Sequence, residues 1–232
     1  MSLFPAVTWL AVRELWISFR LITIIALFLL AGALVALLPG LGQRQPASWY
    51  AIGLTVASAA AGGLTAAILS VERRRGTAAW LASRAVPRVT LLVSWFIAVL
   101  AAAVAGFIPG SALAWFTIMP ASPALDPQRF AVGLLAAGSG SLACLALGML
   151  TGALLPPARA TLLTLLVCAA AAAGSLAVPD ARSLTPATGY FLLAEVPTGW
   201  PLGRALQAIG IGLATTALLL AAAGLALERA DL

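Results

Sequence analysis

The sequence predicts an all-α integral membrane protein with six transmembrane helices. Hydrophobic residues make up 62% of the 232-residue chain and charged residues only 9%, whereas a soluble domain carries roughly 25% charged residues. Six apolar runs approach or exceed the length of about 20 residues that a helix needs to cross a bilayer. With so few charges the chain cannot cover a soluble surface, so we expect lipid to be the solvent for most of it.

The six expected spans are separated by proline and glycine, and together they form one transmembrane domain, residues 1–232. Their approximate ranges are 21–38, 48–71, 89–117, 129–155, 158–178 and 204–227. Pro39-Gly40 and Pro156-Pro157 fall in the gaps, where helices are expected to end. Pro109-Gly110 lies inside the third run, and we expect it to kink or break that helix because proline removes a helical hydrogen bond.

An interfacial amphipathic helix is expected before the first span, over residues 3–19. Trp9, Arg13, Trp16 and Arg20 recur at intervals of four, three and four residues. This spacing places all four on one side of a helix. Tryptophan favours the headgroup level and arginine can extend to lipid phosphate, so we expect these residues to contact the membrane interface. The alternative is that the segment merely extends the first span.

The distribution of arginine predicts the orientation, since all 13 basic residues are arginine. With a cytoplasmic N-terminus, nine of them fall on the inner side and four on the outer side. The positive-inside bias therefore places both termini in the cytoplasm, together with the loop between the second and third spans. The net charge of +6 arises in short gaps between apolar runs, and not on the basic face of a folded domain, so we expect no nucleic-acid partner.

Several residue types that catalysis or cofactor binding requires are missing. The chain has no lysine, which excludes a Walker A loop for ATP, and no histidine, which excludes a Ser-His-Asp triad and His-based zinc or haem sites. Cys144 and Cys168 lie inside apolar runs and are expected to be small core residues, not a disulfide or a metal pair. We therefore predict no catalytic residue, no metal site and no cofactor in this chain.

Two further features concern packing. Residues 179–203, between the last two spans, contain an apolar piece that is too short to span, and we expect a re-entrant or interfacial helix there. Thr185-Pro186 is a favourable helix start, and Pro197 is expected to end the helix. Three G-x-x-x-G spacings leave open either a dimer contact or close packing within the chain; they are Gly106/Gly110, Gly148/Gly152 and Gly199/Gly203.

The segment from Glu72 to Arg88, directly after the second span, carries the pattern most suggestive of function. After Gly76, the run from Thr77 to Ala85 can form a short cytoplasmic helix. Trp80 and Leu81 would then be exposed apolar side chains on an arginine-rich loop, which is a suitable docking surface for another protein. The alternative is an ordinary positive-inside loop that lies on the membrane.

This segment resembles the one between the second and third spans of the type-2 permease (transmembrane) subunits of ATP-binding-cassette exporters. The residues that carry the resemblance are Glu72, Gly76-Thr77, Trp80-Leu81, Ser83 and Pro87-Arg88, in that order. The C-terminal residues Glu228 to Leu232 resemble the charged cluster on which that family often ends. The N-terminal helix, the six spans and the apolar outer piece also match. Ala78, Ala79 and Ala82 are smaller than the residues often found there.

The resemblance implies a permease subunit in the bacterial cytoplasmic (inner) membrane. Two permease subunits, identical or homologous, would pair, and separate ATPase subunits would bind ATP and Mg²⁺. The segment 73–86 would be the coupling helix, and the expected coupling residues are Glu72, Arg73, Gly76, Thr77, Trp80, Leu81, Ser83, Pro87 and Arg88. The absence of acidic or basic residues in the interior of spans two to six favours an apolar or amphiphilic cargo. Two alternatives are a permease subunit of the cytochrome c maturation type and a membrane scaffold or assembly factor without transport activity.

Overall fold

The structure, a computed structural model, describes residues 4–37, 46–74, 87–121, 126–177 and 184–229. Within these ranges it is all helical, with eight helices and no strand. The helices are α1 (Phe4–Ile17), α2 (Arg20–Leu37), α4 (Pro46–Arg74), α6 (Arg88–Ala121), α7 (Pro127–Leu154), α8 (Pro157–Ala177), α10 (Thr188–Ala194) and α11 (Leu202–Arg229). All except α1 and α10 are long and apolar enough to cross a membrane. The predicted class and its six membrane-spanning candidates are therefore confirmed, and each begins and ends within a few residues of the expected positions.

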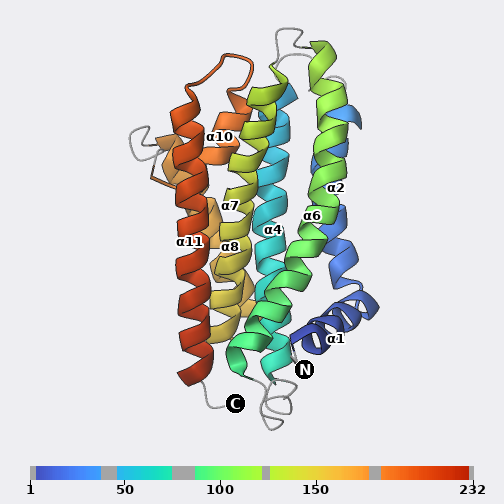
Figure 1. The fold of residues 1–232 in the computed structure, drawn as a ribbon, viewed down its shortest axis with the longest axis vertical. Helices are drawn as coiled ribbons and strands as arrows, with labels where there is room; N and C mark the ends of the chain where they lie inside the picture. Colours follow the sequence, from blue (N-terminus) through green and yellow to red (C-terminus); the bar gives the residue numbers. More distant parts are fainter. Residues whose placement is uncertain (1–3, 38–45, 75–86, 122–125, 178–183, 230–232) are drawn as a thin grey trace.

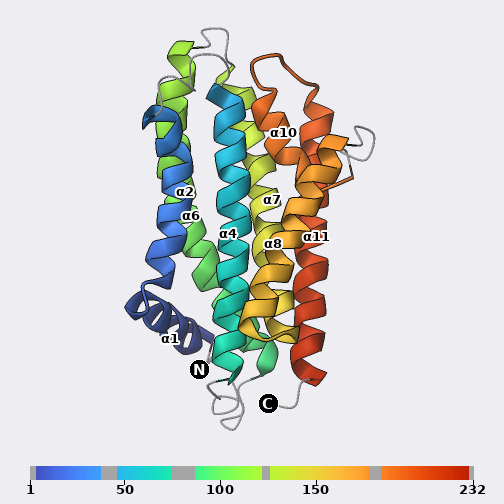
Figure 2. The ribbon, with the colours of Figure 1, turned by 180° about the vertical axis from the view of Figure 1, so that it is seen from behind.

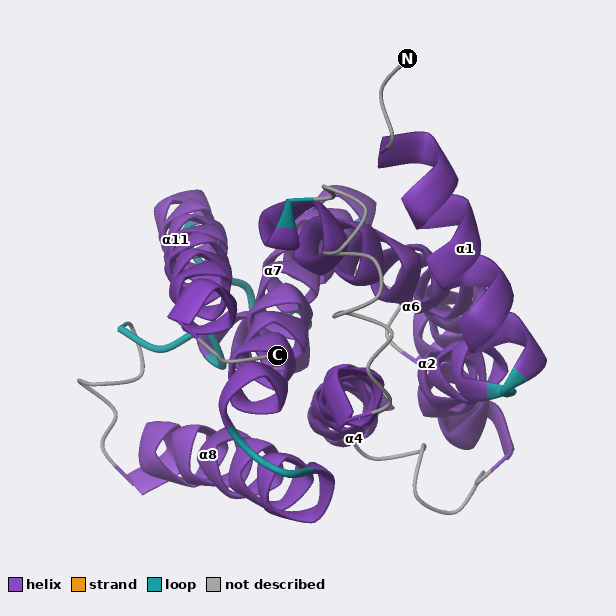
Figure 3. Cartoon of the chain, turned by 90° about the horizontal axis from the view of Figure 1, so that it is seen from below, coloured by secondary structure: helices purple, strands orange, loops and turns teal. Residues whose placement is uncertain are grey.

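The six long helices run side by side along the long axis of the molecule (Figures 1 and 2). α7 packs against α4, α11 and α8, while α2 packs against α6 and α4. Seen from below, α4 and α7 occupy the middle of the bundle and α1 lies at its edge (Figure 3). α8 buries few side chains and is the most peripheral of these helices. Of the two helices on either side of the 75–86 segment, α4 therefore lies in the middle of the bundle.

α6 continues through Pro109 as one helix of 34 residues, so the break that we allowed for is absent. The axis of α6 changes direction along its length (Figure 1). Gly106 and Gly110 lie directly against the backbone of α2, at Ile25 and Phe28. Because neighbouring helices support the chain where proline removes a hydrogen bond, a membrane-spanning helix can tolerate this residue.

The first two G-x-x-x-G spacings serve packing within the chain. Besides the contact of Gly106 and Gly110 with α2, Gly148 and Gly152 of α7 lie against the backbone of α4, at Gly62 and Ala66. A side chain at either position of α7 would meet a carbonyl group of α4. Small residues allow helix backbones to approach this closely. Gly203, by contrast, has open space around it.

α1 is a separate helix that runs across the end of the bundle (Figure 1). It ends at Ile17, and Phe19 in the turn that follows has a φ of 58°, a left-handed conformation that ends a helix. α1 buries Val7, Ala11 and Leu15 and packs against α6. The alternative in which this segment merely extends the first span is therefore wrong.

α10 is the short helix expected between the last two spans, and it packs against α7 and α4. It begins at Thr188, later than we predicted, with Ala187 at its N-cap position, and the Thr185 hydroxyl hydrogen-bonds with that of Ser175 (2.7 Å). Trp200 donates its indole N–H to the carbonyl oxygen of Leu192 (2.8 Å), which ties the chain after α10 back to it. Burial raises the pKa of Tyr190 well above its usual value, so its hydroxyl stays neutral.

Hydroxyl and thiol groups link α4, α7, α8 and α10 inside the bundle. The Ser141 hydroxyl lies 2.8 Å from that of Ser58 and 3.2 Å from that of Tyr190. Cys144 and Cys168 are free thiols, as predicted. The two thiols contact each other, since the Cys168 thiol donates to the Cys144 sulfur at 3.6 Å.

Candidate functional site

The two ends of the bundle differ in charge. We call "basic end" the end where α4, α7 and α11 finish, where α2, α6 and α8 begin, and where α1 lies (Figure 1). Of the nine arginines in the described ranges, two are at the opposite end, Arg129 and Arg204. The other seven are at the basic end; they are Arg13, Arg20, Arg73, Arg74, Arg88, Arg159 and Arg229. The predicted functional residues that the structure describes also lie at this end.

The predicted coupling segment is described at its two flanks. Five of its expected residues lie in 75–86, outside the described residues; they are Gly76, Thr77, Trp80, Leu81 and Ser83. Glu72 and Arg73 lie in the last turn of α4. Pro87 directly precedes α6, and Arg88 is the first residue of α6. The geometry of the site is therefore the geometry of these flanks.

Glu72 forms an ion pair with Arg20. The Arg20 Nη1 lies 3.7 Å from the Glu72 Oε1, and the Glu72 side chain is only 6% exposed. The Glu72 side chain thus reaches from the last turn of α4 to the first residue of α2. A buried carboxylate requires such a partner. This ion pair ties the end of α4 to the junction between α1 and α2.

The position of Arg20 corrects one expectation from the sequence. Trp9, Arg13 and Trp16 lie on one exposed face of α1. Arg20 is not on that face, because the turn at Phe19 separates it from α1 and makes it the first residue of α2. The contact of the three exposed residues with a membrane interface remains a prediction.

Arg88, at the other flank, caps the end of α11. Its Nη1 donates to the carbonyl oxygens of Leu227 (2.7 Å) and Glu228 (2.9 Å). The last four carbonyl groups of a helix lack partners within the helix and carry partial negative charge, so a guanidinium stabilises them. This contact joins the start of α6 to the C-terminal end of the last spanning helix.

A third polar contact holds α4 at this end. The Ser70 hydroxyl donates to the carbonyl oxygen of Leu155, in the turn between α7 and α8, at 2.7 Å. The two flanks of the 75–86 segment are thus bonded to three other elements, which are α2, α11 and the α7–α8 turn. A displacement of that segment would therefore be transmitted to α2, α11 and the α7–α8 turn.

Ser70 and Arg229 were not among the site residues predicted from the sequence. Arg229 lines a notch at the basic end together with Arg73. A basic residue in the last turn of a span was the available signal for Arg229. The sequence offered no signal for Ser70, because its partner is a backbone carbonyl group of a different turn.

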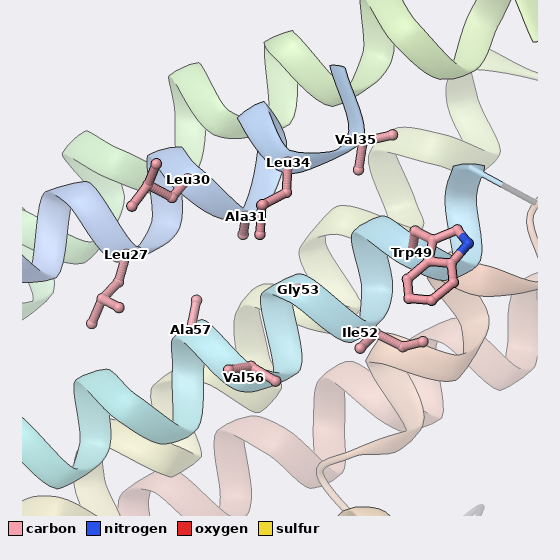
Figure 4. A pocket seen from close by; sticks show the side chains of 10 residues that line it. All are labelled: Leu27, Leu30, Ala31, Leu34, Val35, Trp49, Ile52, Gly53, Val56 and Ala57. Carbon is pink, nitrogen blue, oxygen red and sulfur yellow. The ribbon is translucent and has the colours of Figure 1, made fainter. Parts of the chain in front are cut away.

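A second cavity lies in the other half of the bundle, between α2 and α4. It has a volume of about 380 Å³ and is lined almost entirely by apolar side chains. Leu27, Leu30 and Leu34 of α2 and Trp49, Ile52 and Val56 of α4 line it from two sides (Figure 4). Among the described residues, no group of three or more histidine, cysteine or acidic side chains is placed to hold a metal ion.

No family model matches the sequence, and no curated protein or solved structure matches it. The resemblance to type-2 permeases therefore rests on the sequence pattern alone.

Proposed function

We propose that this chain is the membrane-spanning permease subunit of an ATP-driven exporter and that separate ATPase subunits act on it through the 72–88 segment. The observation that carries this proposal is the anchoring of both flanks of the segment. Glu72 is paired with Arg20 of α2, and Arg88 caps α11. A loop that only lay on the membrane would not need to be bonded to two distant helices.

The anchoring suggests how a movement would be transmitted. An ATPase that pushes or turns the 75–86 segment would displace the ends of α4 and α6. Because the ion pair and the cap join these ends to α2 and α11, those helices would move with them. Packed helices respond as rigid bodies over such short distances. The first, second, third and sixth spans would therefore respond to one event at the basic end.

The orientation follows from the arginines. Seven of the nine described arginines lie at the basic end, and the positive-inside bias supports a cytoplasmic position for that end, where ATP is available. The bacterial inner membrane is the location that the family resemblance implies. ATP and Mg²⁺ would bind to the partner ATPase.

The cargo that fits best is apolar or amphiphilic. Among the described residues, the charged side chains of the six spans lie in their first or last turns, so the spans offer no titratable relay for a proton-coupled mechanism. The apolar cavity between α2 and α4 also favours such a cargo. A bundle of six helices is narrow, so a second permease subunit would complete the pathway.

The proposal is tested by the composition of the native complex. We expect the tagged chain, purified from its own membranes in mild detergent, to have the mass of two permease subunits and two ATPase subunits, and to hydrolyse ATP. A single permease chain without an ATPase would contradict the proposal and favour a scaffold or assembly factor.

A further inference from the structure

A notch of about 530 Å³ opens at the basic end, between the ends of α7 and α11. Among the described residues that line it, Arg73 of α4 and Arg229 of α11 are charged. Leu150 and Leu154 of α7 and Leu225 and Ala226 of α11 form most of its remaining wall. The notch therefore combines two permanent positive charges with an apolar surface.

The guanidinium of Arg73 lacks a partner for one of its nitrogens. Its Nη1 is enclosed and has no hydrogen-bond acceptor among the residues that the structure describes. An enclosed donor without an acceptor is unfavourable, and more so when it belongs to a charged group. The guanidinium carries five donors in one plane, so an oxyanion held in the notch could bind its other nitrogens and compensate the charge.

The charge and the apolar wall are arranged in order along the helices. Arg229 is in the last turn of α11, and Leu225 is one turn further from the end. Leu154 ends α7, and Leu150 is one turn further into that helix. Arg73 is likewise in the last turn of α4. Positive charge thus lies at the boundary of the predicted membrane region, and apolar side chains lie deeper.

We propose that the notch binds one anionic phospholipid, with its phosphate on Arg73 and Arg229 and the start of an acyl chain along Leu150 and Leu225. A phospholipid has the same order of groups, a negative headgroup at the boundary and hydrocarbon below it. Arginine binds phosphate oxygens through paired hydrogen bonds, which gives such a contact specificity as well as charge. A free phosphate ion would leave the apolar wall without a partner.

The test compares two lipids that differ only in headgroup. The purified chain in detergent is titrated with palmitoyl-oleoyl phosphatidylglycerol or palmitoyl-oleoyl phosphatidylcholine, and bound lipid is counted by native mass spectrometry. We expect tighter binding of phosphatidylglycerol, weakened about fivefold in Arg73→Gln and again in Arg229→Gln, since an arginine near an anionic surface contributes about a factor of five in affinity. Arg159 is exposed at the same end and lies outside the notch, so the Arg159→Gln variant should bind phosphatidylglycerol as tightly as the parent chain does.

Three results would overturn the proposal. One is equal binding of the two lipids, and another is an equal loss in Arg159→Gln, which would indicate general attraction to a basic surface. The third is displacement of phosphatidylglycerol by 10 mM inorganic phosphate, which would indicate a site for free anions. If Arg73→Gln does not fold, Arg229→Gln decides alone. These results do not depend on whether an ATPase binds the chain.

Discussion

At the basic end, Arg20 forms an ion pair with Glu72, with 3.7 Å between the Arg20 Nη1 and the Glu72 Oε1. Arg20 is the first residue of α2, and Glu72 lies in the last turn of α4. The pair connects the α1–α2 junction to the helix that leads into the predicted coupling segment. It joins two sets of residues that the sequence suggested separately, the membrane-interface set and the coupling set. The pair can therefore transmit a movement as well as stabilise the bundle.

Glu72→Gln should uncouple transport more than it weakens association with the ATPase. The substitution keeps the size of the side chain but removes the charge, and it leaves Arg20 without its carboxylate. We expect a loss of about 1–3 kcal/mol in stability, because the pair is largely buried but long. Thermal unfolding in detergent measures the stability, and cargo-stimulated ATP hydrolysis measures the coupling.

The double variant Arg20→Glu with Glu72→Arg is the matched control for this pair. If the pair acts as proposed, the swap should recover part of the loss that either single variant shows. Additive losses in the double variant would show that the two side chains do not interact in the membrane.

Arg88→Gln should loosen the end of α11. The variant loses the positive charge that binds the carbonyl groups of Leu227 and Glu228, at a cost of about 1 kcal/mol. We expect faster hydrogen exchange in the last turns of α11 and little change in its middle. Arg159→Gln, in an exposed position at the same end, should leave this exchange unchanged. Equal exchange in the two variants would argue against the cap.

Gly148→Val should destabilise the bundle strongly, by about 3 kcal/mol or more, because the new side chain would meet the carbonyl group of Gly62. Gly203→Val is the control, since its surroundings are open. Thermal unfolding of the two variants separates packing within the chain from packing between chains. If Gly148→Val instead left stability intact and only dissociated a dimer, this packing arrangement would be wrong.

The basic end should face the cytoplasm. In a chain without native cysteines, a cysteine introduced at Ser83 should not react with an impermeant maleimide added to intact cells. A cysteine at Gln128, exposed at the start of α7 at the opposite end, should react. The reverse labelling pattern would invert the proposed orientation.

Hydropathy predicted the spans because each span is a local property of some 20 residues. The contacts between spans were not predictable in this way. Arg20 was expected to share one face with Trp9, Arg13 and Trp16, because that expectation assumed one continuous helix. The left-handed conformation of Phe19 interrupts the helix. A non-glycine residue rarely adopts this conformation, so the sequence carried little warning.

In the candidate site, too, the contacts between helices could not be predicted from the sequence. Glu72 and Arg88 were singled out from the sequence, but their partners, Arg20 and the carbonyl groups of α11, were not. Both partners are distant in sequence and depend on which helices are neighbours. Thr185 was expected to cap α10, whereas the N-cap position is Ala187 and the Thr185 hydroxyl hydrogen-bonds with that of Ser175 in α8.

The central claim is that an ATPase acts on this chain through the segment between α4 and α6. The most direct test is Trp80→Ala in the reconstituted complex, with ATPase binding and cargo-stimulated ATP hydrolysis measured together. A central aromatic anchor contributes about 2–4 kcal/mol, so we expect ATPase affinity to fall roughly 30- to 1000-fold while membrane insertion is unchanged. If Trp80→Ala keeps full ATPase binding and full transport, the coupling role is wrong and the segment is an ordinary loop on the membrane.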